Sequence, residues 1–303
     1  MFCNVDPSQV ICVPNVNSLY QVPLTFEDEG VVQFLTNRLR LPVVALNKFK
    51  QNMSIWRELT YRVEHITEEL CIGLVGKYTK FGDSYMSVVK ALEHATVACG
   101  YKLKLQYIEA CNLEPATQTK DPVKYHEAWQ TLCRSVGIIV PGGFGERGVE
   151  GKIIAANWAR KNKKPFLGVC LGMQCAVIEF ARNVVGWADA HSAELNPKTA
   201  HPVVIEMPEH NPGDLGGTMR LGLRETVFGK NVSSVIQKLH GNVDSVEERH
   251  RHRYEVNPEM VDEFESHGMH FVGRDTTGKR MEIMEVSGML NVILFSLTYF
   301  CCV

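Results

Sequence analysis

Between residues 71 and 183, short apolar runs alternate with stretches of helical periodicity, and no other feature of the sequence limits the fold as strongly. The apolar runs predict strands over Cys71–Gly76, 103–107, Val136–Val140 and Phe166–Val169, and the periodic stretches predict helices over 84–92, Glu127–Cys133, Val149–Asn162 and Leu171–Asn183. Strands that alternate with helices are joined by right-handed crossovers into a parallel sheet. The sequence therefore predicts an α/β fold, with a mainly parallel sheet flanked by helices.

The segments on either side of this alternation have a different pattern. After residue 200, strands with only short helices between them are predicted at Pro202–Glu206, Met219–Val227, Val246–Val256, His270–Gly273 and Met281–Val286, which adds antiparallel strands to the sheet. The first 45 residues lack the periodicity of a complete domain. A helix is predicted within 46–70, after a polar joint at Leu46–Lys50, because Trp56, Leu59, Val63 and Ile66 recur at helical spacing.

The segment Gly168-Val169-Cys170-Leu171-Gly172 takes a predicted strand directly into a predicted helix. It has the form of the nucleophile elbow, G-x-S-x-G, with Cys in place of Ser. On such a sharp turn the neighbours two positions away have to be small, and the helix N-terminus favours thiolate over thiol. A buried structural cysteine is the alternative, but an ordinary strand end needs no glycine on both sides. Cys170 is therefore predicted to be a nucleophile.

A glycine-rich turn, Pro141-Gly-Gly-Phe-Gly145, ends the strand that precedes the elbow strand. In a parallel sheet the carboxyl ends of adjacent strands line the same crevice. The backbone N–H groups of Gly142 and Gly143, helped by that of Leu171, can then stabilise an oxyanion. No Lys-Ser/Thr pair follows at the spacing of a phosphate-binding P-loop, so we predict an oxyanion hole at this turn.

The run Glu247-Glu-Arg-His-Arg-His-Arg-Tyr-Glu255 concentrates charge in the second half of the chain. Strand alternation would place its arginines on one face and His250 and His252 on the other. The flanking carboxylates argue against a phosphate site, and no third ligand at metal spacing accompanies the histidines. A substrate-orienting strand or an ion-pair lattice is the preferred interpretation.

Net charge and the cysteine pattern indicate which partners and which cellular compartment to expect for this chain. Lys+Arg 32 and Asp+Glu 34 leave a net charge of -2, which provides no basic field for nucleic acid or anionic lipid. The ten cysteines include no C-x-x-C pair and the start has no secretory pattern, so we expect reduced thiols and a cytoplasmic location. The apolar stretch Met289–Val303 is shorter than the roughly 20 residues of a membrane-spanning helix, and a buried strand or an aberrant terminus is expected there.

Five motifs, in order along the chain, resemble the CTP synthase family and its class I glutamine amidotransferase domain, which has a flavodoxin-like fold. They are Gly73-Leu-Val-Gly-Lys-Tyr-Thr79, Val140-Pro-Gly-Gly-Phe-Gly145, Phe166-Leu-Gly-Val-Cys-Leu-Gly-Met-Gln174, Glu209-His-Asn-Pro through Gly-Gly-Thr-Met-Arg220, and Glu248-Arg-His-Arg-His-Arg-Tyr-Glu-Val-Asn257. The resemblance covers about Cys71 to Val286. It implies a remnant of the family's synthetase domain over 1–45, a linker helix over 46–70 and an amidotransferase domain over 71–303 that is atypical from 287, so that the chain lacks both ends of the family pattern.

The resemblance also implies roles for individual residues. Cys170 is similar to the family's nucleophile, Gly143, Leu171, Gly172, Met173 and Gln174 resemble the residues around the glutamine side chain, and Glu194 and Arg253 resemble those that hold its amino-acid end. Family chemistry implies thiolate attack on the amide of L-glutamine and transfer of the ammonia to UTP. That transfer uses ATP and Mg²⁺ in the synthetase domain, with GTP as activator, and the family forms homotetramers and filaments. We expect no cofactor and no metal on this chain itself.

One departure from the family pattern bears on activity. The family continues, after another strand, with a His-Pro-Glu motif that completes a Cys-His-Glu triad, whereas Ser287–Val303 contains no histidine. Loss of a positioned acid–base group typically slows a reaction by roughly 10²- to 10⁴-fold, so we expect impaired hydrolysis. A non-catalytic fragment that assembles with the complete enzyme is an alternative. A γ-glutamyl hydrolase or peptidase of the same fold is another, against which the loop around Asn211 speaks.

Overall fold

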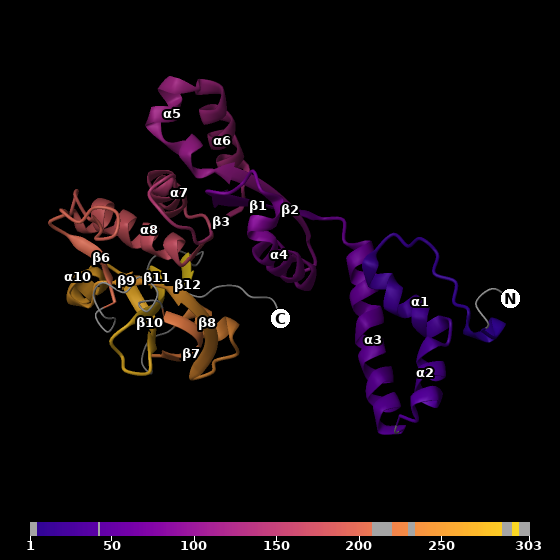
Figure 1. Cartoon of the computed structure of the whole chain (residues 1–303). Helices are drawn as coiled ribbons and strands as arrows, with labels where there is room; N and C mark the ends of the chain where they lie inside the picture. The colour runs from indigo at the N-terminus through magenta and orange to yellow at the C-terminus, as the bar shows by residue number, and fades with distance from the viewer. Residues whose placement is uncertain (1–4, 42, 208–219, 230–233, 287–292, 297–303) are drawn as a thin grey trace. The chain divides into compact units, whose positions relative to one another are not determined.

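The computed structural model describes residues 5–41, 43–207, 220–229, 234–286 and 293–296 (Figure 1). The predictions on the loop at 209–219 and on most of the segment after 286 lie outside the described residues. Internal contacts divide the chain into two units, one that contains the residues up to Glu69 together with Glu93–Lys102, and one that contains Leu70–Leu92 and the residues from Leu103 onward.

The first unit is helical. After the short turns η1 (Pro7–Gln9) and η2 (Leu19–Gln21), it contains α1 (Val22–Asp28), α2 (Val31–Leu39) and α3 (Val43–His65). Helix α3 begins before the predicted polar joint at Leu46–Lys50 and runs through it without a break. Trp56 Nε1 and Thr60 Oγ1 both donate to the carbonyl oxygen of Tyr20, at 2.7 and 3.0 Å, and thereby fasten α3 to the chain before it. The segment 1–45 and all of 46–70 except its last residue thus share one unit, and their assignment as remnant and linker stays a prediction.

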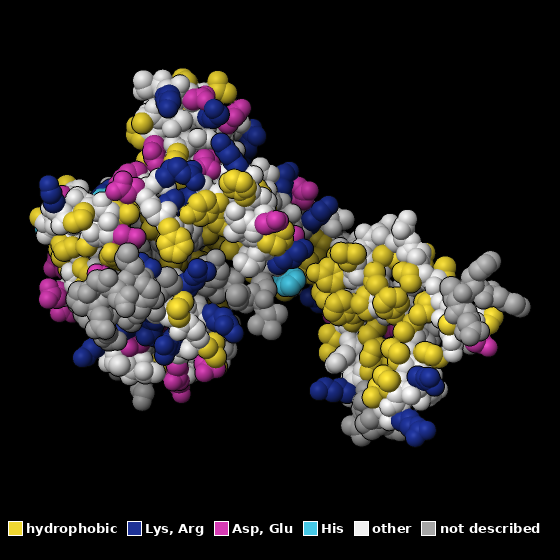
Figure 2. Space-filling view, viewed as in Figure 1, with side chains coloured by type: hydrophobic (Ala, Val, Ile, Leu, Met, Phe, Trp, Pro, Cys, Tyr) yellow, Lys and Arg dark blue, Asp and Glu magenta, His cyan; other side chains and the backbone are white. Residues whose placement is uncertain are grey.

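The face of this unit seen in Figure 2 is rich in hydrophobic side chains. Exposed apolar residues on its helices include Phe26, Phe34, Leu35, Leu39 and Ile55. On the second unit, by contrast, Lys and Arg side chains are interspersed with Asp and Glu (Figure 2). None of the helices formed by the described residues combines the length and the hydropathy that a membrane span requires.

The second unit is built on a nine-stranded sheet with the order β2-β1-β3-β4-β12-β11-β10-β7-β8. Its strands are β1 (Glu69–Gly76), β2 (Lys102–Glu109), β3 (Gly137–Val140), β4 (Phe166–Val169), β7 (Arg220–Phe228), β8 (Ser245–His252), β10 (Met269–Asp275), β11 (Met281–Val286) and β12 (Ile293–Ser296). The pairs β1–β3, β3–β4 and β4–β12 are parallel, and β11, β10, β7 and β8 continue the sheet antiparallel. The predicted α/β fold with added antiparallel strands is confirmed.

A smaller sheet and the helices complete this unit. Strands β5 (His191–Ser192), β6 (Pro202–Glu206) and β9 (Tyr254–Val256) form the small sheet. The helical elements are η3 (Gly82–Tyr85), α4 (Met86–Ala98), η4 (Ala110–Leu113), α5 (Pro115–Lys120), α6 (Pro122–Arg134), α7 (Val149–Lys161), α8 (Leu171–Phe180), the π-turn η5 (Ala181–Val185), α9 (Val235–Leu239), η6 (Pro258–Met260) and α10 (Val261–Ser266). The strand predicted over Val246–Val256 is interrupted at Arg253, because β8 pairs with β7 whereas β9 pairs with β6.

Apolar side chains on the parallel strands point alternately to the two faces of the sheet, and helices cover both faces. Ile138 and Val140 of β3 belong to the core that includes α7 and α8, whereas Ile139, between them, packs with Leu74 and the buried side of α4. Successive side chains of a strand point to opposite faces, so each short apolar run supplies both layers. This packing fixes the carboxyl ends of β3 and β4 next to each other, in register Val140 with Gly168.

Strand β12 lies in the part of the chain after 286, where we expect a departure from the family pattern. It pairs in parallel with β4, Ser296 opposite Val169, and antiparallel with β11, Ile283 opposite Ser296. The strand expected near the end of the chain is thus present, and it fills the place between the parallel and the antiparallel halves of the sheet. The elbow strand β4 is consequently hydrogen-bonded on both sides.

Candidate active site

Cys170 occupies the turn between β4 and α8 with backbone angles φ 53° and ψ −110°. A positive φ is rare for a residue with a side chain and costs about 1–3 kcal/mol where it occurs. The turn places Cys170 at the N-terminal end of α8, with its side chain partly exposed and the Sγ atom 3.9 Å from the carbonyl oxygen of Arg251. The geometry is that of the predicted nucleophile elbow.

Gly172 allows α8 to begin this close to the sheet. A Cβ atom on Gly172 would lie 1.9 Å from the carbonyl oxygen of Val140, at the end of β3. Since ordinary contact starts near 3.4 Å, no side chain fits at this position without a shift of backbone. The second glycine of the elbow is therefore required by the approach of helix and strand.

The predicted oxyanion loop, Pro141–Gly145, lies against Cys170. A Cβ atom built on Gly142 would be 3.4 Å from the Cβ atom and 3.8 Å from the Sγ atom of Cys170. The N–H group of Phe144 donates to the hydroxyl of Tyr78 at 3.3 Å. The loop is thus fixed beside the sulfur, where its backbone N–H groups can meet an anion that forms on a substrate.

Two buried lysines hold the carbonyl oxygens of the same loop. Lys152 Nζ, from α7, donates to the carbonyl oxygens of Pro141 and Gly142 at 2.6 and 3.5 Å. Lys77 Nζ, at the end of β1, donates to those of Phe144, at 2.6 Å, and Gly145. Lys152 is fully buried and Lys77 is 2% exposed. Sequence reasoning did not assign a role to either lysine.

A cavity of about 240 Å³ opens on one side of Cys170. Six of the eight predicted site residues line it, namely Gly143, Cys170, Leu171, Gln174, Glu194 and Arg253. Burial raises the pKa of Glu194, and the charges of Arg253 and Lys77 oppose that rise. A carboxylate and a guanidinium group in one small cavity are complementary to the ammonium and carboxylate groups of a free amino acid.

The other two predicted residues, Gly172 and Met173, are buried, and the structure does not place them among the residues that line the cavity. Gln174 is 5% exposed and its side-chain amide donates to the carbonyl oxygen of Tyr254 at 3.0 Å, which ties α8 to β9. Arg253 lies between the end of β8 and the start of β9, and it is one of the residues that line the cavity. The roles given to these residues by resemblance stay predictions.

The surroundings of Cys170 disfavour ionisation of its thiol. Burial raises its pKa, while the backbone N–H of Leu171 and the charge of Lys152 act in the opposite direction. The helix terminus thus favours the thiolate as expected, but burial outweighs it.

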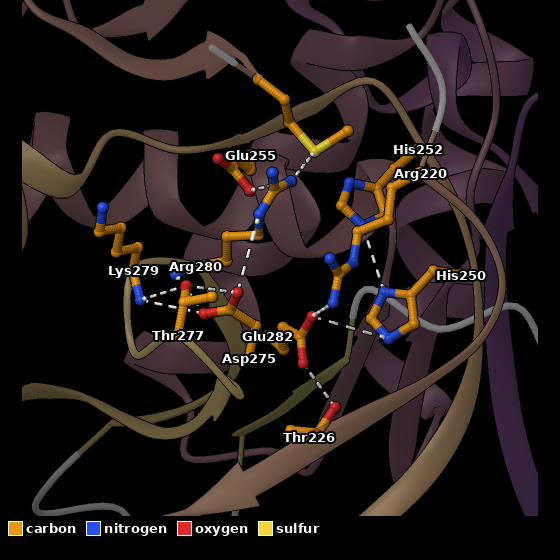
Figure 3. Close-up of polar contacts among 11 residues, drawn as sticks. Arg220, Thr226, His250, His252, Glu255, Asp275, Thr277, Lys279, Arg280 and Glu282 are labelled. Atoms are coloured by element: carbon orange, nitrogen blue, oxygen red, sulfur yellow. Dashed lines mark hydrogen bonds and ion pairs between the residues drawn. The ribbon is translucent and has the colours of Figure 1, made fainter. Parts of the chain in front are cut away.

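The histidines of the charged run are directed away from the solvent into a network of buried polar groups (Figure 3). His250 Nδ1 and His252 Nε2 are 3.2 Å apart, and Glu282 lies between Arg220 and Thr226, 2.6 Å from each. Burial lowers the pKa of His250 to about 4 and that of His252 to about 3, so both rings are neutral at pH 7.

The interpretation of the charged run as a substrate-orienting strand or an ion-pair lattice stays a prediction. The run contributes His250 and His252 to the buried network, whereas an ion pair within it joins Arg220 to Glu282, which lie outside the run. Arg280 extends the network, lying 3.6 Å from Glu255 and 3.9 Å from Asp275 (Figure 3). Arg249 and Arg251 are exposed on the opposite face of β8. Within the described residues, no three His, Cys, Asp or Glu side chains are grouped so as to hold a metal ion.

A family model described as glutamine amidotransferase class-I matches residues 81–291. The chain belongs to this family. It is related to CTP synthases, with 59% identity to CTP synthase 1 of Danio rerio over 94% of this chain and 48% of that protein. Identity to CTP synthase 1 of Homo sapiens is 56%, again over 94% of this chain and 48% of that protein.

A solved structure of the same family agrees with the fold. The glutaminase domain of Trypanosoma brucei CTPS, with bound acivicin, superposes with a TM-score of 0.68 at 38% identity, covering 76% of this chain and 85% of that one. The chain therefore contains a class I amidotransferase domain of the CTP synthase type. It spans about half the length of the CTP synthases that it matches.

Proposed function

We propose that this chain is the glutaminase half of a CTP synthase, which supplies ammonia for the ATP-dependent amination of UTP in the cytoplasm. The elbow at Cys170, next to a loop with bare N–H groups and a cavity suited to an amino acid, carries this proposal. The free state of the described cysteines, Cys170 and Cys175 among them, suits a reducing compartment. UTP, ATP with Mg²⁺ and a GTP activator would act on the part of the relatives that lies outside this chain, in a tetrameric assembly.

Glutamine binding, attack on its amide and stabilisation of the resulting anion each have residues suited to them. Glu194 and Arg253 would hold the ammonium and carboxylate ends of L-glutamine, which directs its side-chain amide toward Cys170. The Cys170 sulfur would then form a bond to the amide carbon. The oxygen becomes an anion that the backbone N–H groups of Gly143 and Leu171 stabilise. Collapse of this intermediate breaks the C–N bond and releases ammonia, and water hydrolyses the remaining thioester to glutamate.

The departing nitrogen has to receive a proton, and this proton transfer limits the rate at which the chain would cleave glutamine. Among the described residues that line the cavity, His252 is the histidine, and its ring is buried, hydrogen-bonded to His250 and neutral. A group with a pKa near 3 holds almost no proton at pH 7, so it is a poor general acid. We therefore infer that this chain binds glutamine and forms adducts at Cys170, but turns glutamine over roughly 10²- to 10⁴-fold more slowly than a complete triad.

Covalent labelling tests the assignment of the site. A chloroketone analogue of glutamine should modify Cys170 in the whole chain, as located by peptide mass spectrometry, and free glutamine should protect it. A Cys170→Ala variant should lose the label, whereas a variant of the exposed Cys133, Cys133→Ala, should keep it. Preferential labelling of any other thiol would refute the proposal. Release of ammonia at the rate of a complete amidotransferase would refute the inferred impairment alone.

The exposed apolar helices of the first unit favour a second candidate function. A surface with this many exposed apolar side chains is characteristic of a protein interaction site. The chain would then act as a non-catalytic fragment that assembles with a full-length CTP synthase. Co-purification with the full-length enzyme, without labelling of Cys170, would support this candidate over the first.

A further inference from the structure

The buried ammonium group of Lys152 is the feature of the site that the proposed chemistry leaves unexplained. Lys152 lies in the first turn of α7, where the positive end of the helix dipole disfavours a cation. Its side chain is fully buried, although lysine is one of the residues least often found inside proteins. A buried cation at such a position requires compensation from the groups around it.

The compensation comes from the oxyanion loop. Lys152 Nζ is 2.6 Å from the carbonyl oxygen of Pro141 and 3.5 Å from that of Gly142. The structure contains no cis peptide bond in its described part, and in a trans peptide the carbonyl oxygen and the following N–H group point in opposite directions. When Lys152 draws these two carbonyl oxygens to its side of the loop, the N–H groups of Gly142 and Gly143 point to the other side.

The helix holds the lysine firmly in this place. A Cβ atom on Gly151 would lie 1.8 Å from the carbonyl oxygen of Ala110, so the first turn of α7 rests directly on η4. Lys152 also acts on the sulfur, because its charge is the side-chain charge that favours the thiolate of Cys170. Burial lowers the pKa of Lys152 to about 8, and the sulfur atoms of Cys175 and Cys170 oppose this effect.

We propose that Lys152 is a positioning residue for glutamine cleavage: it orients the N–H groups of Gly142 and Gly143 toward the reacting carbon and supplies positive charge to the anions formed there. This inference rests on the proposed function. It predicts that Lys152 contributes little to the affinity for glutamine, since the amino-acid end is held by other residues. Its contribution is to the step in which the sulfur forms its bond.

Two alkylating reagents separate the two effects of Lys152. The chloroketone analogue of glutamine forms an oxyanion when the sulfur adds to its carbonyl group, whereas iodoacetamide reports only the fraction of thiolate. Both are measured on the whole chain as the rate of modification of the Cys170 peptide between pH 6 and 9. Variants Lys152→Met and Lys152→Gln remove the charge, Lys152→Arg keeps it, and Lys161→Met is the matched control at the exposed end of the same helix.

We expect the neutral variants to lower the maximal rate of chloroketone labelling about tenfold or more, up to the roughly 10²- to 10³-fold loss that removal of a whole oxyanion donor causes. The concentration for half-maximal labelling should change less than about twofold, and the iodoacetamide pH profile should shift to higher pH. Lys152→Arg should restore most of the rate, and Lys161→Met should match the unaltered chain.

Folded neutral variants that label at the unaltered rate would overturn this inference. So would an equal loss in Lys161→Met, or loss of folding in both neutral variants, because Lys152 would then serve the fold alone. These results are distinct from failure of the proposed function, in which the unaltered chain itself is not labelled at Cys170 by the chloroketone.

Discussion

Substitution of Gly172 by alanine should damage the elbow more than its single methyl group suggests. The added Cβ atom would lie 1.9 Å from the carbonyl oxygen of Val140, so helix and strand would have to separate by about 1.5 Å to reach ordinary contact at 3.4 Å. Val140 cannot yield easily, because β3 is paired with β4 on one side and β1 on the other. Excess volume in a packed core typically costs about 1–3 kcal/mol, and the shift moves the N-terminal end of α8 away from its place.

The same shift should reduce the reactivity of Cys170. A displacement of about 1 Å can lower the rate of a reaction that depends on orientation by roughly 10²-fold. Urea unfolding measures the loss of stability, and chloroketone labelling of Cys170 measures the loss of reactivity. Gly82→Ala is the matched control, since a Cβ atom there meets nothing within 4 Å, and it should stay within about 0.5 kcal/mol. A Gly172→Ala chain with unaltered stability and labelling rate would contradict this reasoning.

Two further predictions concern stability. Because burial holds the pKa of His250 at about 4 and that of His252 at about 3, the unfolded rings take up protons first when the pH falls below 6.5. The free energy of unfolding should therefore fall by about 1.4 kcal/mol per pH unit for each ring between pH 6.5 and 4.5, and a flat profile in urea unfolding would contradict the buried network. Arg160→Met should cost about 3–5 kcal/mol, since it removes the 2.7 Å charged partner of Glu179, which is 3% exposed and keeps the 2.9 Å hydrogen bond from Asn157. Arg62→Met, which removes an ion pair with the exposed Glu58 and a 3.5 Å hydrogen bond to the carbonyl oxygen of Ala98, should cost less than about 1 kcal/mol, and equal losses in the two variants would refute the distinction.

Local rules were sufficient for the elbow and for most of the sheet. The turn at Cys170 was predictable because a strand runs directly into a helix there, with a glycine two positions before and two positions after the cysteine. The interruption at Arg253 was not predictable, since strict alternation continues through it. The strand is divided there because β8 and β9 pair with partners in two different sheets. Such a division depends on tertiary pairing, which the pattern of a single segment does not contain.

The two lysines at the oxyanion loop were missed for a related reason. Pattern analysis expects lysine at the surface, so Lys77 and Lys152 were left without a role. A signal was nevertheless available for Lys152, because it lies three and four residues from Val149, Ala155 and Ala156, on the buried side of α7. A charged residue in phase with an apolar stripe is a reason to look for buried carbonyl groups nearby.

The position of β12 in the sheet affects the order in which the strands can pair during synthesis. A growing polypeptide exposes β3, β4 and the elbow long before Ile293–Ser296 has been synthesised, yet β4 pairs with β12 up to Val169, the residue before Cys170. Until Ile293–Ser296 has been synthesised, strand β4, which leads into Cys170, can pair with β3 but not with β12. The edge of β4 that faces β12 can be closed only after this segment has been synthesised, so the pairing of the strand that leads into Cys170 is completed long after Cys170 itself has left the ribosome.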